Sequence, residues 1–390
     1  MVSSGDRYNY GDLLFPIVTS WALRSAGYPT ISYGLRRSDL SGFGALPSRG
    51  IKDLYRDAED GDVVLLAGGE NLAQRWFDMH LTLLGAEGAQ SLVRFQQRFG
   101  IGMAQRRSRW QLCARQEFPY IISPDRFRAK VRVMYNSMGG WPLRDYPAKD
   151  QRSIVRDLAK ASFLSVREEE SAAILRELDA TLPVSVAPDC VFLLPEMLSR
   201  EELRRKASPG VRKLVSEAGE YFCFQCQCRY GAAHRGELAR QLRALAGRCG
   251  WNILLTPIGR IFSLEDDVFL ESLSAELGGA PMLPASAGIY DVAYALASAR
   301  LFCGTSLHGM VTALTYEVPF VPLANDDPKV GNNVRSWGLE EAFPSAAVEE
   351  LASHGERCLR WTGAFLAEHA ERLRRAAGEN MQCLAERILA

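Results

Sequence analysis

The sequence has no excess of charge of either sign. Its 390 residues contain 46 Lys or Arg and 46 Asp or Glu, so the formal net charge at pH 7 is zero. A protein that holds a nucleic-acid backbone usually carries a broad basic field, and this chain has none. We therefore expect no nucleic-acid partner, and any anionic ligand must be held by local cations.

Long apolar runs and a disulfide framework are also missing. No stretch approaches the roughly 18 consecutive apolar residues of a membrane-spanning helix, and residues 1–12 lack the features of a signal peptide. The nine cysteines are odd in number and widely spread, unlike the dense spacing of a secreted disulfide scaffold. These absences predict no transmembrane segment and a location in the reducing cytoplasm.

Neither common nucleotide-binding motif occurs. The sequence contains no G-x-x-x-x-G-K-[ST] and no G-x-G-x-x-G, which excludes the simplest P-loop and dinucleotide-binding interpretations. The trio Cys223, Cys226 and Cys228 suggests part of a zinc site, but residues 223 and 226 point to opposite faces of a predicted strand and no second close pair completes the set. We expect buried thiols there and no metal site.

What is present predicts an α/β protein of two to three domains. Short runs rich in Val, Ile, Leu and Phe alternate with amphipathic segments of helix length, as in parallel sheets covered by crossover helices. The predicted strands are Val63–Ala67, Val131–Tyr135, Phe163–Val166, Val184–Ala187, Tyr221–Gln225, Ile253–Thr256, Leu301–Cys303 and Phe320–Leu323. The predicted helices are Leu13–Ala26, Gln151–Ala161, Glu168–Leu178, Arg235–Arg248, Glu265–Leu277 and Val292–Ala299.

This alternation predicts two similar halves. We expect an N-terminal α/β domain over residues 1–194, a linker with a short solvated helix over 195–215, a C-terminal α/β domain over 216–345, and helices over 346–390 broken at Gly355, Gly363 and Gly378. Ligands of open parallel sheets bind beyond the carboxyl ends of the strands, so the cleft between the halves is the expected site.

Three short segments carry candidate residues, each with a structural alternative. Asn9-Tyr10-Gly11-Asp12 leads into a helix, for which Asp12 would serve as N-cap. Gly68-Gly69 permits either a sharp turn or close approach of the backbone to a ligand. Ser165 and Glu168 fit a capping box, whereas Arg167 suits either an ion pair with its acidic neighbours or an anion.

The strongest segment is Cys303-Gly304-Thr305-Ser306-Leu307-His308-Gly309, a predicted strand followed by a turn and a helix. His308 would lie in the first helical turn, facing the cleft. A lone histidine is usually a packed or solvated side chain, but this position favours function.

Together these segments resemble the polysaccharide pyruvyl transferase family, whose members move the pyruvyl group of phosphoenolpyruvate onto a sugar as a ketal. The similar segments are Asn9-Tyr10-Gly11-Asp12, Gly68-Gly69, Ser165-Val166-Arg167-Glu168, Ala187-Pro188-Asp189, Leu307-His308-Gly309, Val318-Pro319, Lys329 and Trp337-Gly338-Leu339. The resemblance implies two Rossmann-like domains facing a cleft, like those of GT-B glycosyltransferases, with a C-terminal helical tail. The N-terminal domain would serve the acceptor and the C-terminal domain the donor.

The resemblance also implies roles for individual residues. His308 would be a general acid or base, with Asp12 and Asp189 as candidate bases, although a cap and a turn explain these two aspartates equally well. The substrate-binding candidates are Arg167, Lys329, Thr305, Ser306, Asn9, Gly68 and Gly69. Phosphoenolpyruvate would be the donor substrate with no further cofactor, and a glycan or lipid-linked oligosaccharide the acceptor, which allows peripheral contact with a membrane.

Two alternatives stay open. Many family members have Arg two residues before the histidine, where this chain has Ser306, so a catalytically inactive relative is conceivable. A glycosyltransferase of the same architecture that uses a nucleotide sugar is the other alternative. Neither the acceptor sugar nor the oligomeric state follows from the sequence.

Overall fold

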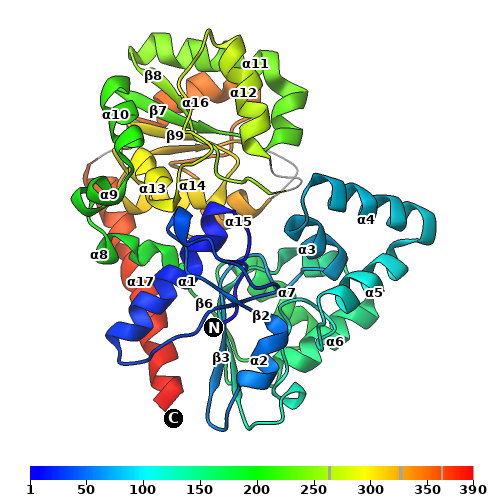
Figure 1. Ribbon diagram of the computed structural model, residues 1–390. Helices are drawn as coiled ribbons and strands as arrows, with labels where there is room; N and C mark the ends of the chain where they lie inside the picture. The colour runs from blue at the N-terminus through cyan, green and yellow to red at the C-terminus, as the bar shows by residue number, and fades with distance from the viewer. Residues whose placement is uncertain (262–264, 325–327, 362, 390) are drawn as a thin grey trace.

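Two parallel β-sheets, one in each half of the chain, organise the computed structural model, which describes residues 1–261, 265–324, 328–361 and 363–389 (Figure 1). The N-terminal sheet has the strand order β3-β4-β5-β6, and the C-terminal sheet has the order β10-β9-β7-β8. The near-continuous apolar sequence of strands such as β7 (Tyr221–Gln225), buried at every position, is typical of a sheet covered on both faces.

The N-terminal sheet is wound in both directions from the extended segment at Val2. Its strands are β1 (Tyr33–Gly34), β2 (Arg49–Gly50), β3 (Val63–Ala67), β4 (Arg132–Met138), β5 (Phe163–Val166) and β6 (Val184–Val186). Val2 forms parallel bridges to Tyr33 and Leu66 and so joins the β1–β2 pair to β3. The chain therefore reverses its winding direction between Val2 and β3, the switch point of a Rossmann sheet.

The C-terminal sheet repeats this winding. It contains β7, β8 (Asn252–Leu255), β9 (Leu301–Gly304) and β10 (Phe320–Pro322), and it is extended by single bridges from Leu255 to Met282 and from Leu323 to Ala346. Its switch point lies between β7 and β9, which are neighbours in the sheet. The loops that follow β7 and β9 thus open at the same edge.

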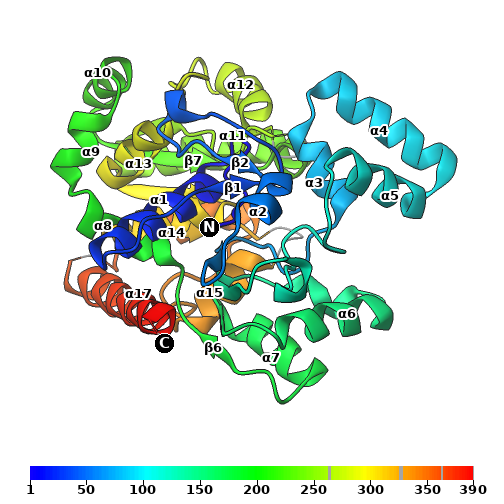
Figure 2. The same cartoon turned by 60° about the horizontal axis from the view of Figure 1, so that its bottom comes forward.

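Helices cover both sheets, as Figures 1 and 2 show. Those before β7 are α1 (Tyr10–Ser25), α2 (Ile51–Asp57), α3 (Trp76–Leu83), α4 (Ala86–Phe99), α5 (Ile101–Gln111), α6 (Ala148–Leu158), α7 (Glu169–Leu178), α8 (Leu194–Met197), α9 (Arg200–Lys206) and α10 (Pro209–Ala218). Those after it are α11 (Cys228–Cys249), α12 (Asp266–Glu276), α13 (Ile289–Ser298), α14 (Leu307–Thr315), α15 (Lys329–Ser336), α16 (Leu351–Cys358) and α17 (Ala364–Leu389). The short 3₁₀ helices are Ser41–Phe43, Pro124–Arg126, Trp141–Asp145, Cys190–Leu193 (η4) and Val348–Glu350.

Packing crosses between the two halves. Although α1 follows Val2, which is bridged to the N-terminal sheet, its apolar side chains belong to the same buried cluster as those of the C-terminal sheet and of η4. A second cluster fills the N-terminal sheet and its own helices. Helix α1 therefore holds the switch-point loop of one sheet against the other.

The C-terminal tail is helical, as predicted, but only one of the three predicted breaks occurs. Helices α16 and α17 run through Gly355 and Gly378, and the chain bends near Gly363, where φ is +58°. Gly378 causes no break because a single helical glycine costs only about 1 kcal/mol, which packing of the surrounding apolar side chains outweighs.

Helix α17 returns to the N-terminal half and lies beside α1 (Figure 1). There the Arg132 guanidinium donates to the carbonyl oxygens of Arg387 and Ile388 at 2.6 Å each, and the Asn380 amide donates to Asn136 Oδ1 at 2.6 Å. The C-terminal tail thus packs against both halves of the chain.

The predicted elements lie close to the observed ones, but several observed elements differ from the prediction or are absent from it. Strand β4 continues to Met138 through a register shift, where Ser137 adopts a φ of +49°. The expected linker is mostly helical, because Ser199 and Ser208 cap α9 and α10. The prediction did not include the short strands β1 and β2 or the helices α2, α3, α4, α5 and α15. Helix α11 begins at Cys228 rather than Arg235 and is kinked at His234. None of the described helices is both long and apolar enough to cross a bilayer.

Candidate functional site

A cavity of about 490 Å³ opens where the two switch points face each other. Its walls come from the loop after Val2, the turn after β3, the start of α7, the loops after β7, β8 and β9, and helices α3 and α15. The lining includes Ser4, Arg7, Asn9, Asp12, Glu70, Asn71, Asp78, Thr82, Arg167, Gln225, Gln227, Asp266, Thr305, Ser306, His308 and Lys329. Seven of the ten predicted site residues are thus brought together; Asp189, Gly68 and Gly69 are not at the wall.

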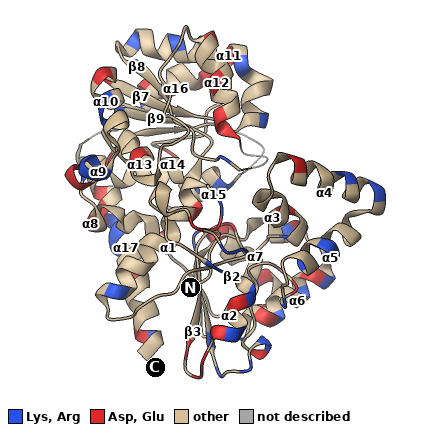
Figure 3. Ribbon diagram, in the orientation of Figure 1, with Lys and Arg blue, Asp and Glu red and all other residues tan. Residues whose placement is uncertain are grey.

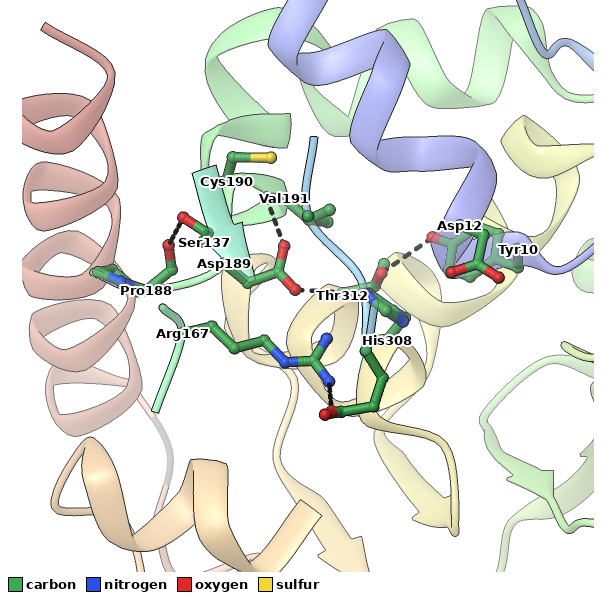
Figure 4. A network of polar contacts seen from close by, with 12 residues as sticks. Tyr10, Asp12, Ser137, Arg167, Pro188, Asp189, Cys190, Val191, His308 and Thr312 are labelled. Atoms are coloured by element: carbon green, nitrogen blue, oxygen red, sulfur yellow. Dashed lines mark hydrogen bonds and ion pairs between the residues drawn. The ribbon is translucent and has the colours of Figure 1, made fainter. Parts of the chain in front are cut away.

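His308 lies in the first turn of α14, as predicted, and is held from behind by Asp189. His308 Nε2 is 3.2 Å from Asp189 Oδ2, and the aspartate side chain is fully buried (Figure 4). The other carboxylate oxygen, Oδ1, accepts from the backbone N–H of Val191 at 2.9 Å and so caps η4. Neither His308 Nε2 nor Asp189 Oδ2 has a hydrogen-bond partner among the described residues, so this is a charge contact, and the negative charge of the carboxylate favours a proton on Nε2.

The imidazole ring is further fixed by close packing. A Cβ atom added to Gly11 would lie 1.9 Å from His308 Nδ1, so only glycine admits the ring at this point of α1. Phe15, one turn later, meets the ring edge-on with a centroid distance of 5.0 Å. Gly68 in turn makes room for Phe15, since its own Cβ would lie 2.0 Å from that ring.

The glycine pair therefore supports the site without lining it. Gly68 and Gly69 have φ angles of +62° and +86°, which glycine adopts without strain. A Cβ on Gly69 would approach the Asn71 amide to 2.6 Å, and that amide donates to the carbonyl oxygen of Gly68 at 2.8 Å. The turn that they form carries Glu70 and Asn71 to the cavity wall.

Asp12 is a cavity residue rather than the predicted N-cap. Helix α1 begins at Tyr10, so Asn9 occupies the cap position and Asp12 falls in the first turn. The Asn9 amide donates to Asp12 Oδ2 at 3.0 Å. Burial raises the pKa of Asp12, and the nearby Arg7 and His308 oppose this effect only in part.

Arg167 forms ion pairs with acidic neighbours and also lines the cavity, so both interpretations that the sequence left open stay compatible with its position. It lies at the end of β5, is 1% exposed, and still lines the cavity. Its guanidinium contacts Glu70 Oε2 at 2.6 Å and Glu168 Oε2 at 3.2 Å. Burial lowers the pKa of Arg167, but Glu70, Glu168 and Asp189 outweigh burial and raise it above its ordinary value.

The predicted capping box is absent because α7 begins later than expected. Glu168 is itself at the cap position of α7, and Ser165 remains in β5, where its hydroxyl accepts from the Ser137 N–H at 2.9 Å. The buried Glu168 carboxylate instead accepts from the Ser171 hydroxyl and from Arg167. These contacts do not cap α7. They fix the guanidinium of Arg167 at the carboxyl end of β5.

Hydrogen bonds join the loop after β9 to the start of α14 and to the loop after β7. The hydroxyl of Ser306 caps α14 by accepting from the Gly309 N–H at 3.2 Å, and the hydroxyl of Thr305 accepts from the Gln227 N–H at 3.1 Å. Gln225 Oε1 in turn accepts from the Thr305 N–H at 3.1 Å. These bonds tie together the two loops of the C-terminal switch point.

Four charged wall residues were not predicted from the sequence, because none belongs to a recognised motif: Arg7, Glu70, Asp78 and Asp266. Arg7 is 5% exposed, pairs with Asp6, and donates to the hydroxyls of Tyr120 and Thr82. Asp266 Oδ2 accepts from Gln225 Nε2 and from the N–H groups of Ile258 and Gly259 at 2.8–3.0 Å. Burial raises the pKa of Asp266 to about 7.

Metal ligands are not grouped in the described part of the chain. No cluster of three or more His, Cys, Asp or Glu side chains that could hold an ion occurs among the described residues. Cys223 and Cys226 are fully buried thiols, and burial raises the pKa of both.

Solved structures with the same fold include two bacterial or archaeal epimerases. The UDP-GlcNAc 2-epimerase of Neisseria meningitidis, bound to UDP-GlcNAc, has a TM-score of 0.53 at 12% identity and covers 97% of either chain. The UDP-GlcNAc 2-epimerase of Methanocaldococcus jannaschii has a TM-score of 0.52 at 10% identity over 95% of this chain and 96% of that one. These likenesses confirm an α/β fold of the GT-B type.

A search of curated proteins returned no match. The family model described as polysaccharide pyruvyl transferase matches residues 9–327, which contain both switch points and most of the cavity wall. The chain belongs to the polysaccharide pyruvyl transferase family.

Proposed function

We propose that this protein transfers the pyruvyl group of phosphoenolpyruvate to two hydroxyls of a glycan sugar, forming a ketal during polysaccharide biosynthesis. One observation carries the proposal: the cavity is lined by His308, which is backed by the buried Asp189, and by the three cations Arg7, Arg167 and Lys329. The reaction needs no cofactor beyond its donor substrate.

The donor requires compensation of charge. Its phosphate and carboxylate bring close to three negative charges to a wall that holds Arg7, Arg167 and Lys329 but also four carboxyl groups, those of Asp12, Glu70, Asp78 and Asp266. The three cations must supply the attraction, and burial raises the pKa of Asp12, Asp78 and Asp266, which favours their neutral forms. Arg167 presents a planar fork that suits a carboxylate or two phosphate oxygens, although it also neutralises Glu70 and Glu168. The amino end of α14 adds a favourable dipole beside them.

The chemistry requires two proton transfers between substrates. The methylene carbon of the donor gains a proton while one sugar hydroxyl adds to the neighbouring carbon and loses its own proton. The carbon–oxygen bond to phosphate then breaks, and the second hydroxyl closes the ketal and gives up its proton as phosphate departs. The two hydroxyl protons thus account for the new methyl group and for the released hydrogen phosphate.

We assign these transfers to His308 and Asp12. Asp189 holds His308 Nε2, so the imidazole exchanges a proton at Nδ1. Asp12, whose pKa is raised by burial, is a stronger base than an exposed aspartate and takes a proton from an acceptor hydroxyl. Asp189, buried behind the imidazole, is a positioning residue rather than a base that reaches the acceptor.

The acceptor side is less defined. A glycan or lipid-linked oligosaccharide assembled in the cytoplasm would enter from the N-terminal domain, past α3 and the turn after β3. Ser306 in place of the arginine found in many family members does not by itself indicate loss of activity, because His308, Arg167 and Lys329 are all retained beside it.

Thermal unfolding with ligand titration tests the proposal. Phosphoenolpyruvate at a hundredfold excess over its Kd should stabilise the fold by about 2.7 kcal/mol through mass action, raising Tm. A shift with uridine diphosphate but none with phosphoenolpyruvate would instead favour a nucleotide-sugar glycosyltransferase, which shares the fold. A folded chain that responds to neither ligand would indicate an inactive relative.

A further inference from the structure

A helical hairpin made of α4 and α5, residues 86–111, projects from the N-terminal domain (Figures 1 and 2). Its inner face packs on α3 through a small apolar cluster of Phe77, Leu92 and Ala104 that is separate from both main cores. Helices α4 and α5 pack mainly on each other and on α3. The catalytic proposal makes no use of this hairpin.

The hairpin concentrates positive charge in a chain whose total charge is zero. The hairpin, residues 86–111, contains five arginines, one acidic residue (Glu87) and no Asp or Lys, and Figure 3 shows basic positions along both helices. The five are Arg94, Arg98, Arg106, Arg107 and Arg109, and Arg115 follows four residues after α5. Arg94, Arg98 and Arg106 are exposed and form no ion pair with any described residue. This surface therefore attracts anions.

Large apolar side chains are exposed on the same hairpin. Phe99, Ile101, Met103 and Trp110 are 50%, 49%, 48% and 78% exposed, and they are four of the seven exposed large apolar residues in the described chain. Phe99 and Ile101 flank Gly100, whose φ of +82° makes the turn between the helices. Met103 and Trp110, seven residues apart, share one face of α5 with Arg106 between them.

We propose that the α4–α5 hairpin binds an anionic lipid surface, with its apolar side chains in the interface and its arginines on the head groups. Interleaved arginines and apolar side chains on a helix that is too polar to span a bilayer are typical of a segment that lies in the membrane interface. Trp110 is well suited to that position, because an indole ring has one apolar and one polar part.

Two other occupants fit less well. A second copy of the chain would bring two sets of five arginines face to face, and such like charges repel. A single-stranded nucleic acid would use aromatic rings to stack bases, but Ile101 and Met103 at the turn are aliphatic and gain only from an apolar medium. An anionic lipid surface accounts for both the arginines and the exposed apolar side chains of the hairpin.

Docking through this hairpin would also orient the cavity. The hairpin packs on α3, and Asp78 and Thr82 of α3 lie in the cavity wall, where Thr82 accepts from the Arg7 guanidinium at 2.5 Å. A lipid-linked acceptor held at the membrane would then reach the cavity along α3. This last step rests on the proposed function, whereas binding of the hairpin to lipid does not.

Cosedimentation of the full chain with vesicles tests the proposal. We expect the protein to bind vesicles of phosphatidylcholine and phosphatidylglycerol in equal parts, to bind phosphatidylcholine alone far more weakly, and to lose binding at high salt. Substitution of Arg94, Arg98 and Arg106 by Gln should weaken partitioning by roughly 100-fold, at about fivefold per charge. The double variant Ile101→Ser, Met103→Ser should also weaken it.

Matched controls separate the hairpin from general effects. Ile31→Ser with Val268→Ser removes two apolar side chains that are similarly exposed elsewhere, and this variant should bind as the parent does. Circular dichroism and Tm should show that each variant folds. Trp110 should add a blue shift of fluorescence on binding that is absent from Trp110→Phe.

The proposal is overturned if the parent does not bind anionic vesicles, or if the arginine variant binds them equally well. It is also overturned if the hairpin variants change the sedimentation coefficient of the free protein, which would indicate a second copy, or if only single-stranded RNA binding depends on these residues. Because no donor is present in this assay, its outcome is independent of the phosphoenolpyruvate titration.

Discussion

His308 Nε2 lies 3.2 Å from Asp189 Oδ2, and this contact joins the two halves of the fold. Asp189 follows the last strand of the N-terminal sheet, whereas His308 follows β9 of the C-terminal sheet. The aspartate is fully buried, so the imidazole is held at the cavity wall by a group that solvent does not reach. Any motion between the two sheets would change the orientation of the imidazole.

Asp189→Asn tests the positioning role. The amide keeps an oxygen for the Val191 N–H but loses the charge that favours one tautomer of His308. We expect kcat to fall by roughly 10² to 10⁴ with little change in the KM for phosphoenolpyruvate or in Tm. Steady-state kinetics at saturating acceptor, with Tm measured in parallel, checks this. A large loss of Tm with proportionate loss of activity would show that Asp189 serves the fold alone.

His308→Asn separates proton transfer from donor binding. Asparagine keeps a hydrogen-bonding group of related reach but exchanges no proton near neutral pH, so turnover at saturating donor should fall by about 10² to 10⁴ while donor affinity changes little. The measurement is turnover from about pH 5.5 to about pH 9 in parent and variant. Recovery of most of the rate at high donor concentration would contradict an acid or base role.

Gly11→Ala tests how the position of the His308 imidazole affects catalysis, without changing the histidine itself. The new methyl group would lie 1.9 Å from Nδ1 and must displace the ring. A shift of about 1 Å at a reacting group can cost roughly 100-fold in rate, so kcat should fall while the donor still raises Tm. Gly210→Ala in α10, where the added Cβ has no neighbour within 4 Å, is the matched control and should retain activity.

Much of the sheet architecture could be predicted from sequence. Buried parallel strands are continuous apolar runs, and Phe163–Val166 and Tyr221–Gln225 match the prediction at both ends. Helix α5 was missed because only Ala104 and Ser108 on it are buried, which leaves almost no apolar periodicity to detect. A helix that covers a small satellite cluster carries a weak pattern.

The candidate site was predicted only where its residues lie in short segments with recognisable order. His308 and Arg167 follow predicted strands, and both line the cavity. The contact of His308 with Asp189 could not be deduced, because it depends on how the two sheets face each other. Arg7 and Asp266 carry no local signal, and Asp12 was misplaced because α1 begins at Tyr10.

Arg167→Ala should weaken phosphoenolpyruvate binding by about 1.5 to 3 kcal/mol, the usual contribution of a hydrogen bond to a charged group. It should also lower the free energy of unfolding by about 3 to 5 kcal/mol, because the buried Glu168 loses its partner. Arg167→Lys should restore stability better than affinity, since the fork is lost. Calorimetric titration and urea unfolding measure the two effects.

Arg144→Ala is the control for Arg167, because it removes an exposed ion pair with Glu170 and should alter stability by less than about 1 kcal/mol. Donor affinity that survives in Arg167→Ala, with reduced stability, would mean that Arg167 serves only its acidic neighbours.

Asp266 predicts a pH dependence of stability with a definite sign. Burial raises its pKa in the folded state to about 7 from an ordinary value of 3.8, so the folded state binds the proton more tightly than the unfolded chain. The contribution of Asp266 to the free energy of unfolding is therefore fully present below about pH 4 and is lost as pH rises through about 7.

Asp266→Asn tests this dependence. The amide keeps an oxygen acceptor for Ile258, Gly259 and Gln225 but never ionises. Its free energy of unfolding should therefore exceed that of the parent by an amount that grows to roughly 1 to 4 kcal/mol between pH 4 and pH 8. Urea unfolding of both proteins at several pH values measures this difference directly. A constant difference between the parent and Asp266→Asn across this range would mean that Asp266 stays ionised in the folded protein, and that its three donors outweigh the cost of burial.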